Sequence, residues 1–385
     1  MSTTGRAAAP APDASDIAAT LRDATLVQFV AHADGDAVAA SGLLARAVAE
    51  TGGAYQVSVA RTAADAARRV ERAEHTCVTV NAATEADGTT AVDATIVGGE
   101  TPASVTAAAV VRALDATPDP LLVLAGTVAA GYPAGAHGSE HALEAAVAQD
   151  VERRPGVGVP TADIADGLAH TTLVHTADSG DAGAVQATLA SLDLPVELDA
   201  DAHRTVASLV ALDATADDAP GSVEAVERAL RPHETPDGPF ATIEGYADVL
   251  DVSAREAPGV AVALALGHGD RAAALDAWRA RAQRAHAVAR TTETTRYSGL
   301  LVARTDGPTW IAARLLCDFR SPEPVVLAVD DNEATLAGPT GSDQVTTLET
   351  ATTALEGEVG GNGDRAYATF DGEADALVDA VREAL

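Results

Sequence analysis

The chain has 385 residues, which is enough for two or three domains of ordinary size. Hydrophobic residues make up 47% of the sequence, so a wholly disordered protein is excluded. No apolar run approaches the roughly 20 residues that a membrane-spanning helix needs. The two cysteines, Cys77 and Cys317, provide no disulfide framework. We expect a soluble, globular, cytoplasmic protein.

The chain carries 57 acidic and 25 basic residues, a formal net charge of −32, and it contains no lysine. Short carboxylates hold water and cations at a surface in concentrated salt, so this composition is typical of the cytoplasm of a salt-loving archaeon. At molar ionic strength the Debye length is about 3 Å, which largely screens repulsion between the whole surface and a nucleic acid. The net charge therefore says more about the salt concentration in which the protein works than about its binding partner. Whether a nucleic acid binds depends on the local groups at the binding surface.

The N-terminal part alternates short apolar runs with helical stretches. We expect residues 1–15 to be a disordered tail, because they are rich in alanine, proline, serine and threonine. The predicted strands cover residues 26–30, 54–60, 76–80 and 94–97. The predicted helices cover residues 37–50, 63–73 and 104–114, and a further apolar run spans 121–124. This alternation predicts a parallel sheet covered on both faces, with ligands beyond the carboxyl ends of its strands.

The rest of the chain changes character twice. Residues 155–240 are predicted to be mostly helical, 241–253 to hold one or two strands, and 270–290 to form one long helix rich in arginine. A second α/β region follows, with predicted strands at 297–304 and 324–329 and predicted helices at 308–317 and 371–385. We predict an α/β protein with a parallel-sheet domain at 16–195, a helical connector at 196–295 and a smaller α/β domain at 296–385.

Two carboxylates, Asp34 and Asp36, lie at a strand-to-helix turn directly after the first predicted strand. Hard cations such as Mg²⁺ or Mn²⁺ need several oxygen ligands, and neighbouring strand ends commonly supply the others. The alternative is structural, because an aspartate at such a turn often caps the helix that follows. From this motif alone we prefer the helix cap.

The strand, the Asp34-x-Asp36 turn and the small-residue helix at 37–42 resemble the first motif of the DHH phosphoesterase superfamily. Residues 360–363, followed by Ala366 and Phe370, resemble the glycine signature of the associated DHHA1 domain, and 173–195 resembles the archaeal RecJ-like branch. The resemblance implies an N-terminal DHH-type domain. A helical segment and a long helix would join it to a smaller DHHA1-type domain.

Three other motifs of that superfamily are altered here. Asn81 stands where an aspartate is expected, residues 98–100 read Gly-Gly-Glu in place of Asp-His-His, and Ala130 replaces the aspartate of the fourth motif. Two divalent ions about 3.5–4 Å apart need bridging carboxylates and further ligands around them. We therefore expect Asp34 and Asp36 to hold at most one weakly bound Mn²⁺ or Mg²⁺ ion, and we assign no catalytic residue.

Replacement ligands are a second hypothesis for the same site. His137 and His141 are four residues apart with Glu140 between them, while His32 and Glu100 lie beside the first motif and the altered third motif. Two histidines at this spacing share one helical face, as in some metal sites. We prefer the structural alternative, in which these side chains belong to a solvated surface.

Two segments are predicted to contact nucleic acid. Glycines let a backbone approach a phosphate closely, and the resemblance implies such a role for Gly360, Gly361, Asn362 and Gly363, with Arg365 nearby. The second segment is the long basic helix, where we predict contacts from Arg281 and Arg284; Trp278 and Tyr297 are the nearby aromatic residues that could stack on bases. The structural alternatives are a tight connection between elements and arginines paired with acids.

The resemblance implies a role in DNA replication or repair, with three hypotheses for the activity. The first is a catalytically reduced scaffold that binds replication partners, namely the GINS complex and the replicative helicase, with single-stranded nucleic acid as a further ligand. The second is an active exonuclease of the RecJ type, a Mn²⁺- or Mg²⁺-dependent hydrolase of single strands. The third is a phosphoesterase that acts on short oligonucleotides or cyclic dinucleotides. The lost ligands favour the first.

Overall fold

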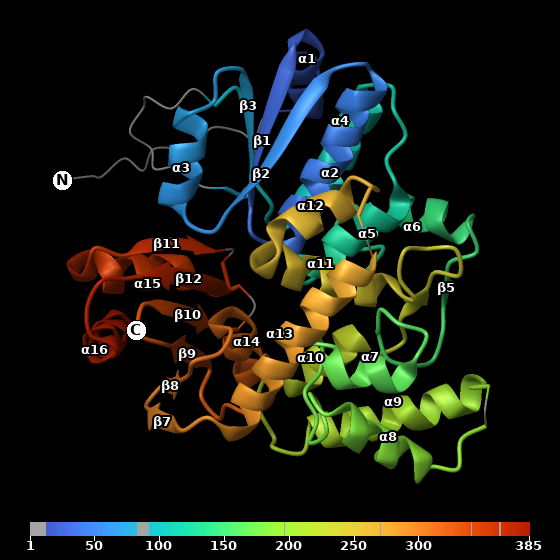
Figure 1. The fold of residues 1–385 in the computed structure, drawn as a ribbon, viewed down its shortest axis with the longest axis vertical. Helices are drawn as coiled ribbons and strands as arrows, with labels where there is room; N and C mark the ends of the chain where they lie inside the picture. The colour runs from blue at the N-terminus through green and yellow to red at the C-terminus, as the bar shows by residue number, and fades with distance from the viewer. Residues whose placement is uncertain (1–12, 83–91, 196, 270, 340, 362) are drawn as a thin grey trace, which may run out of the picture.

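The computed structural model describes residues 13–82, 92–195, 197–269, 271–339, 341–361 and 363–385 (Figure 1). The N-terminal sheet lies at the top of Figure 1 and the C-terminal sheet at the lower left; of the helices of the middle segment, α7 to α10, within residues 164–229, lie at the lower right and α11 to α13, within residues 243–291, in the centre. This arrangement confirms the predicted α/β fold, with a parallel sheet in the N-terminal part and a separate mixed sheet in the C-terminal part. None of the described helices is both long enough and apolar enough to cross a membrane.

The N-terminal sheet has the strand order β2-β1-β3-β4, and all its strands are parallel. Its strands are β1 (Leu26–His32), β2 (Ala54–Ala60), β3 (Thr76–Val80) and β4 (Ala94–Ile96). The helices of this region are α1 (Ala14–Asp23), α2 (Gly35–Glu50), α3 (Ala63–Glu71), α4 (Ala103–Ala113), α5 (Pro120–Ala129) and α6 (Glu140–Val147). The strands lie where the apolar runs predicted them.

Two details of this region differ from, or add to, the sequence analysis. The apolar run 121–124 belongs to helix α5, where Asp119 caps the first turn and Pro120 fixes a helical backbone angle. Helix α1 begins at Ala14, inside the segment expected to be disordered, and residues 1–12 lie outside the described residues.

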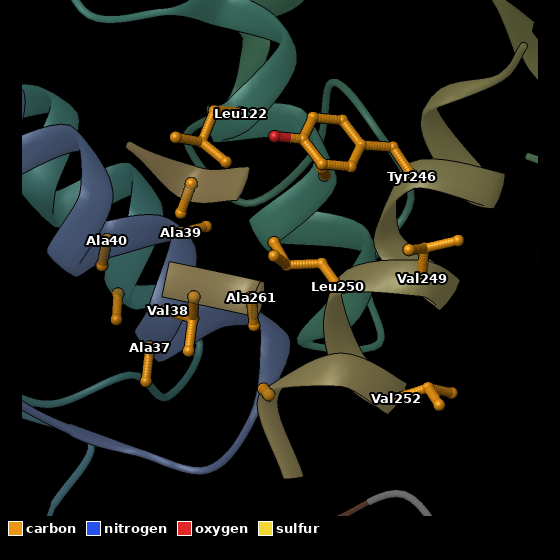
Figure 2. Packing of buried hydrophobic residues seen from close by; sticks show 14 of the residues in the cluster. Ala37, Val38, Ala39, Ala40, Leu122, Tyr246, Val249, Leu250, Val252 and Ala261 are labelled. Carbon is orange, nitrogen blue, oxygen red and sulfur yellow. The ribbon is translucent and has the colours of Figure 1, made fainter. Parts of the chain in front are cut away.

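Helix α2 is buried along most of its length because its side chains are small. Residues 37–40 pack against α5, α11 and α12, as Figure 2 shows. A Cβ atom at Gly42 would lie 2.7 Å from the Cβ and 2.8 Å from the carbonyl oxygen of Ala265, so only glycine permits this approach. The small-residue run thus fixes the depth at which α2, and the turn that precedes it, sit in the core.

The middle segment is mostly helical, as predicted, with one short antiparallel pair of strands. Its elements are β5 (Glu152–Arg153), α7 (Ile164–His170), α8 (Ala182–Ala190), α9 (Ala200–Ala214), α10 (Ser222–Ala229), β6 (His233–Glu234), α11 (Ile243–Glu256), α12 (Pro258–Ala265) and α13 (Arg271–Thr291). The prediction of strands in 241–253 is wrong, because this stretch forms helix α11, capped at Thr242. Helix α13 is the predicted long basic helix.

The C-terminal sheet has the order β11-β12-β10-β9-β8-β7 and is antiparallel except for the β8–β9 pair. Its elements are β7 (Thr294–Tyr297), β8 (Leu300–Arg304), α14 (Thr309–Phe319), β9 (Val325–Val329), β10 (Glu333–Ala337), α15 (Gln344–Thr352), a 3₁₀ turn (Thr353–Leu355), β11 (Glu358–Gly361), β12 (Arg365–Thr369) and α16 (Ala374–Ala384). The strand predicted at 297–304 is a hairpin of β7 and β8.

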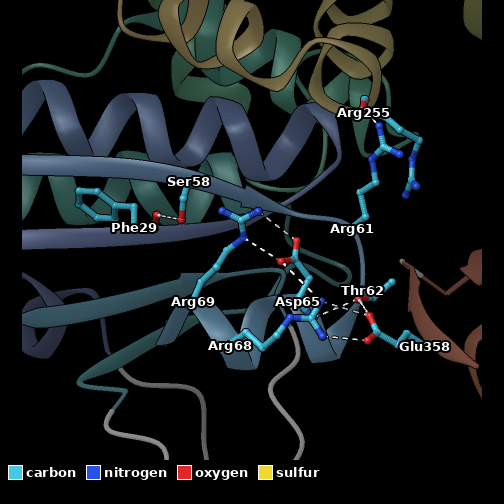
Figure 3. A network of polar contacts seen from close by, with 9 residues as sticks. All are labelled: Phe29, Ser58, Arg61, Thr62, Asp65, Arg68, Arg69, Arg255 and Glu358. Atoms are coloured by element: carbon cyan, nitrogen blue, oxygen red, sulfur yellow. Dashed lines mark hydrogen bonds and ion pairs between the residues drawn. The ribbon is translucent and has the colours of Figure 1, made fainter. Parts of the chain in front are cut away.

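Strand β11 docks the C-terminal sheet onto the start of helix α3 (Figure 3). Thr62 caps α3 through its hydroxyl oxygen and donates the hydroxyl proton to Glu358 at 2.8 Å. Arg68 donates to the same carboxylate at 2.8 Å. A Cβ atom at Gly360 would lie only 2.3 Å from the carbonyl oxygen of Arg61. The two α/β regions therefore meet through close backbone packing and charged hydrogen bonds.

Candidate functional site

A cleft of about 1210 Å³ lies between the N-terminal sheet, helix α11 and the C-terminal domain. Because β1, β3 and β4 are parallel, their carboxyl ends meet at one edge of the sheet, and this edge forms one wall. Residues from all three walls line the cleft, among them Asp34, Asp36, Asn81, Gly98, Gly99, Ala130, Glu244, Asp248, Asp251, Arg314, Gly361, Gly363 and Arg365. The aspartate pair and the residues of the three altered motifs therefore share one cavity.

Asp34 is the N-cap of helix α2. Its Oδ1 accepts a hydrogen bond from the backbone N–H of Ala37 at 2.7 Å, and its Oδ2 lies 2.8 Å from Nδ1 of His32, which donates to it. Both side chains are buried. The helix-cap interpretation of the motif is confirmed for Asp34. His32 bonds to Asp34 through Nδ1, while its buried Nε2 has no hydrogen-bond partner among the described residues, so its role as a replacement ligand stays a hypothesis.

Asp36 caps a different helix. Its Oδ2 accepts from the N–H of Ala103 at 2.7 Å and its Oδ1 from the N–H of Ser104 at 2.9 Å, at the start of α4. The N-cap residue of α4 is Pro102, whose side chain forms no capping hydrogen bond, so Asp36 satisfies donors that the helix leaves open. Burial, and next the charge of Asp34, raise the pKa of Asp36 to about 6.

Asn81 and Gly98 converge on this pair. Asn81 has a left-handed backbone with φ of 51°, and its Oδ1 accepts from the N–H of Gly98 at 2.6 Å. A Cβ atom at Gly98 would lie 3.0 Å from Oδ1 of Asn81 and 3.3 Å from Oδ2 of Asp36. The asparagine therefore holds the chain that follows β4 close to Asp36.

The residues at this edge do not fit a two-metal site. All four carboxylate oxygens of Asp34 and Asp36 accept hydrogen bonds, three of them from backbone N–H groups. The amide oxygen of Asn81 is likewise engaged by a backbone donor. Within the described ranges, no three His, Cys, Asp or Glu side chains are grouped so that they could hold a metal ion. Most of the side-chain oxygens at this edge accept hydrogen bonds from backbone N–H groups.

The histidines proposed as replacement ligands lie away from the aspartate pair. Nδ1 of His137 is 2.7 Å from the carbonyl oxygen of Glu100, and Nδ1 of His141 is 3.3 Å from the carboxylate of Glu144. Both imidazoles and the side chain of Glu140 are exposed to solvent, and none of them lines the cleft. The replacement-ligand hypothesis is wrong for these residues.

Helix α11 supplies a second acidic wall, which the sequence analysis missed. Glu244 accepts from the backbone N–H and from Nδ1 of His233, at 2.9 and 2.8 Å. Asp248 accepts from Nε1 of Trp278 at 2.8 Å, and Asp251 accepts from the N–H of Gly35 at 3.1 Å. These acids are four and three residues apart, a spacing that places them on one helical face and that was visible in the sequence.

Asp251 joins the N-terminal motif to the C-terminal domain. Its Oδ2 lies 3.3 Å from Nη2 of Arg365, and both side chains are more than nine-tenths buried. Burial alone would raise the pKa of Asp251, but the charges of Arg365 and Arg314 outweigh it, so that this pKa is lowered. One buried ion pair thus connects the turn before α2 with strand β12.

The predicted nucleic-acid residues near the C-terminus are divided between packing and the cleft. Gly360 packs against Arg61, as described above, whereas Gly361, Gly363 and Arg365 line the cleft. Asn362 lies outside the described residues. The prediction of nucleic-acid binding therefore rests on the last three positions and stays a prediction.

The arginines of helix α13 have partners within the protein. Arg281 lies 3.1 Å from the carboxylate of Glu256, and Arg284 donates to the carbonyl oxygen of Asp306 at 3.1 Å. Trp278 has no exposed surface, and the ring of Tyr297 is covered by the guanidinium of Arg382 at 4.2 Å. These are the contacts that the structural alternative anticipated, and nucleic-acid binding by Arg281 and Arg284 remains a prediction.

Solved structures show the fold that the chain shares with other proteins. CDC45 from Entamoeba histolytica is similar with a TM-score of 0.55 at 9% identity, over 95% of this chain and 96% of that chain. The two therefore share a fold along nearly their whole lengths. RecJ from Thermus thermophilus, solved in complex with Mn²⁺, has a TM-score of 0.48 at 14% identity; the match covers 98% of this chain and only 54% of RecJ.

The sequence comparison then gives the family. A protein of Haloarcula marismortui, described as uncharacterized protein rrnAC1427, is 46% identical over 389 residues, which cover all of both chains. Residues 292–383 match the family described as the C-terminal domain of that protein. The chain belongs to the rrnAC1427 family.

Proposed function

We propose that this protein is a RecJ-like member of the DHH superfamily that no longer hydrolyses phosphodiesters and acts as a binding scaffold in haloarchaeal DNA replication or repair. The observation that carries the proposal is the hydrogen bonding of Asp36, whose two carboxylate oxygens cap helix α4. In this role the aspartate serves the fold at the position where a hydrolase of this superfamily would place a metal ligand.

A metal ion would compete with helix α4 for the carboxylate of Asp36. An ion that drew the carboxylate of Asp36 away would leave the N–H groups of Ala103 and Ser104 buried without acceptors. Each such loss costs about 1–3 kcal/mol. Asn81 is neutral and Gly98 has no side chain, so neither adds the negative charge that would offset this cost.

The shared fold with CDC45 supports a scaffold role, since the match spans 95% of this chain and 96% of the other. The motif resemblance implies the partners: we propose the GINS complex and the replicative helicase. We propose single-stranded nucleic acid as a further ligand of the C-terminal wall of the cleft, where Arg314 and Arg365 meet Gly361 and Gly363.

A nuclease assay tests the loss of hydrolysis. The purified full chain is incubated with end-labelled single-stranded DNA in molar KCl, with Mn²⁺ and separately with Mg²⁺, beside an Asp36→Ala variant. We expect the wild type to release no more label than the variant. Robust cleavage that Asp36→Ala abolishes would overturn the proposal and identify an active exonuclease.

A binding assay tests the scaffold role. Purified haloarchaeal GINS, and in a second experiment the replicative helicase, is mixed with the full chain in the same buffer, and complexes are separated by size-exclusion chromatography. Binding of labelled single-stranded DNA is followed by fluorescence anisotropy. Co-elution with GINS is expected. If GINS and the helicase both elute alone while DNA binds, the replication-scaffold proposal fails and a nucleic-acid-binding role replaces it.

A further inference from the structure

Two arginines and two aromatic rings form a stack where the C-terminal domain meets helix α11. The guanidinium carbon of Arg255 lies 4.0 Å from the ring centre of Trp310 and 4.5 Å from that of Tyr367. The guanidinium of Arg365 lies 3.8 Å from the ring centre of Trp310. Both guanidinium groups are therefore within cation–π distance of the same indole. We call these four residues the arginine stack.

The arginine stack contains several N–H donors but lacks acceptors for them. Nε, Nη1 and Nη2 of Arg255, Nε1 of Trp310 and Nη1 of Arg365 are buried, and none of them has a hydrogen-bond partner among the described residues. Arg255 and Trp310 are each only 2% exposed. Buried donors of native proteins are nearly always satisfied, so a cluster made only of donors indicates an acceptor that is not part of the chain.

The charges around the stack point to an anion. Asp251 is paired with Arg365, and Glu333 lies 3.9 Å from Arg61, the arginine next to Arg255 in Figure 3. Within the part of the chain that the structure describes, no carboxylate lies within salt-bridge distance of Arg255. Asp251 acts on Arg255 only from beyond salt-bridge distance. A buried cation with no counter-charge in direct contact is costly, and here it occurs in a protein whose net charge is −32.

The ionisation of Arg255 is consistent with this imbalance. Burial lowers the pKa of its guanidinium to about 10; Tyr367 and Asp251 act to raise this pKa, and the charges of Arg61 and Arg365 act to lower it. The group still carries its positive charge at neutral pH.

We propose that the arginine stack binds a chloride ion, which accepts hydrogen bonds from Arg255 and Trp310 at the junction between the domains. A monatomic anion accepts hydrogen bonds from any direction, which suits donors that belong to two different side chains. The composition of the chain indicates a cytoplasm of concentrated salt, in which chloride is an available counter-ion.

Chloride at this position would connect two parts of the molecule. Arg255 belongs to α11, which packs on the N-terminal core, whereas Trp310 and Tyr367 belong to α14 and β12 of the C-terminal domain. Binding would therefore stabilise the association of the domains and the shape of the cleft between them. This inference does not depend on the proposed function, because it involves neither the aspartate pair nor a macromolecular partner.

A thermal unfolding experiment tests the effect. The full chain is kept in concentrated potassium glutamate, and KCl, KBr or potassium phosphate is added in small amounts at constant potassium concentration. We expect Tm to rise with the logarithm of the chloride or bromide concentration, as for a bound ligand, and not with phosphate. A linear response equal for all three salts, or a response to phosphate alone, would overturn the proposal.

Two variants localise the effect. Arg255→Met keeps the bulk of the side chain but removes the donors and should lose the response to chloride. Arg382→Met is the matched control, because Arg382 also stacks on an aromatic ring, Tyr297, but is 44% exposed and bonded to Asp379. It should respond as the wild type does. An equal response in both variants contradicts the assignment.

A crystallographic experiment on the wild type tests whether an anion is bound at Arg255, even if Arg255→Met fails to fold. Crystals grown or soaked in KBr should show an anomalous bromide peak within hydrogen-bonding distance of the nitrogens of Arg255. Ordered water without an anomalous signal at that position would overturn the proposal.

Discussion

Asp36 and Asp251 are both buried and both line the cleft, yet their carboxylates are held in different ways. At the sheet edge, Asp36 accepts hydrogen bonds from two backbone N–H groups. Burial, and next the nearby acid Asp34, raise its pKa to about 6. On helix α11, Asp251 accepts a hydrogen bond from a backbone N–H group and forms an ion pair with the buried Arg365. The positive charge of this arginine lowers the pKa of Asp251.

The two walls of the cleft therefore differ in how their negative charge is balanced. The sheet edge keeps negative charge that no described cation balances at hydrogen-bonding distance, and only helix starts and His32 stabilise it. On the α11 wall, Asp251 is paired with Arg365 and so connects α11 to the C-terminal domain, whereas Glu244 and Asp248 bond to His233 and Trp278 of the middle segment. A buried ion pair tolerates the loss of one partner poorly, whereas a carboxylate with raised pKa is stabilised by protonation.

The largest effect is expected from breaking the ion pair. Asp251→Asn leaves Arg365 buried without its partner, and such a loss costs about 3–5 kcal/mol of the free energy of unfolding. Chemical denaturation in molar KCl measures it. The double variant Asp251→Asn/Arg365→Met should lose less than the sum of the two single variants. Strict additivity would show that the pair is not coupled and would remove the contrast between the walls.

The next effect is a pH dependence at the sheet edge. The folded chain raises the pKa of Asp36 from 3.8 to about 6, so it binds this proton more tightly than the unfolded chain does. The contribution of Asp36 to stability is therefore greatest at low pH and declines by up to about 3 kcal/mol as pH rises from about 4 to above 6.

This pH dependence is isolated by subtraction. The free energy of unfolding of the wild type minus that of Asp36→Asn should fall across the same pH range, because the asparagine does not titrate. If this difference in free energy of unfolding did not change with pH, the pKa of Asp36 would not be raised, and the contrast with Asp251 would be lost.

The smallest effect concerns the glycine segment. Gly360→Ala places a Cβ atom against the carbonyl oxygen of Arg61, and overpacking of this kind costs about 1–3 kcal/mol. Gly259→Ala on helix α12 is the matched control, since a Cβ atom there meets nothing within 4 Å, and it should be neutral or slightly stabilising. An equal, small change in both variants would indicate that Gly360 is not fixed by packing between the domains.

Much of the N-terminal architecture follows from local sequence patterns. The runs at 26–30, 54–60 and 76–80 are short and apolar, and each forms a strand of the parallel sheet. The turn at Asp34 was predicted as a helix cap, which is confirmed, because capping depends on residues close in the chain. Helix α11 was wrongly predicted as one or two strands, although its acids at 244, 248 and 251 have helical spacing.

The long-range part of the site could not be predicted in this way. The partners Asp251 and Arg365 are separated by 114 residues, and Asp36 bonds to residues 67 and 68 positions away. No local pattern connects such groups, because tertiary packing decides which of many acids meets which of many arginines. The arginine stack is hidden for the same reason, since its four members come from three separate elements.

The capping of α4 by Asp36 has a consequence for substitutions at this edge. Placing an aspartate at position 81 and histidines after β4 would not by itself create a hydrolase, because the carboxylate of Asp36 already supports the start of a helix. Metal binding at this edge would first require a new N-cap for α4, for example a serine in place of Pro102. Single substitutions that add metal ligands here are disfavoured for as long as α4 depends on Asp36.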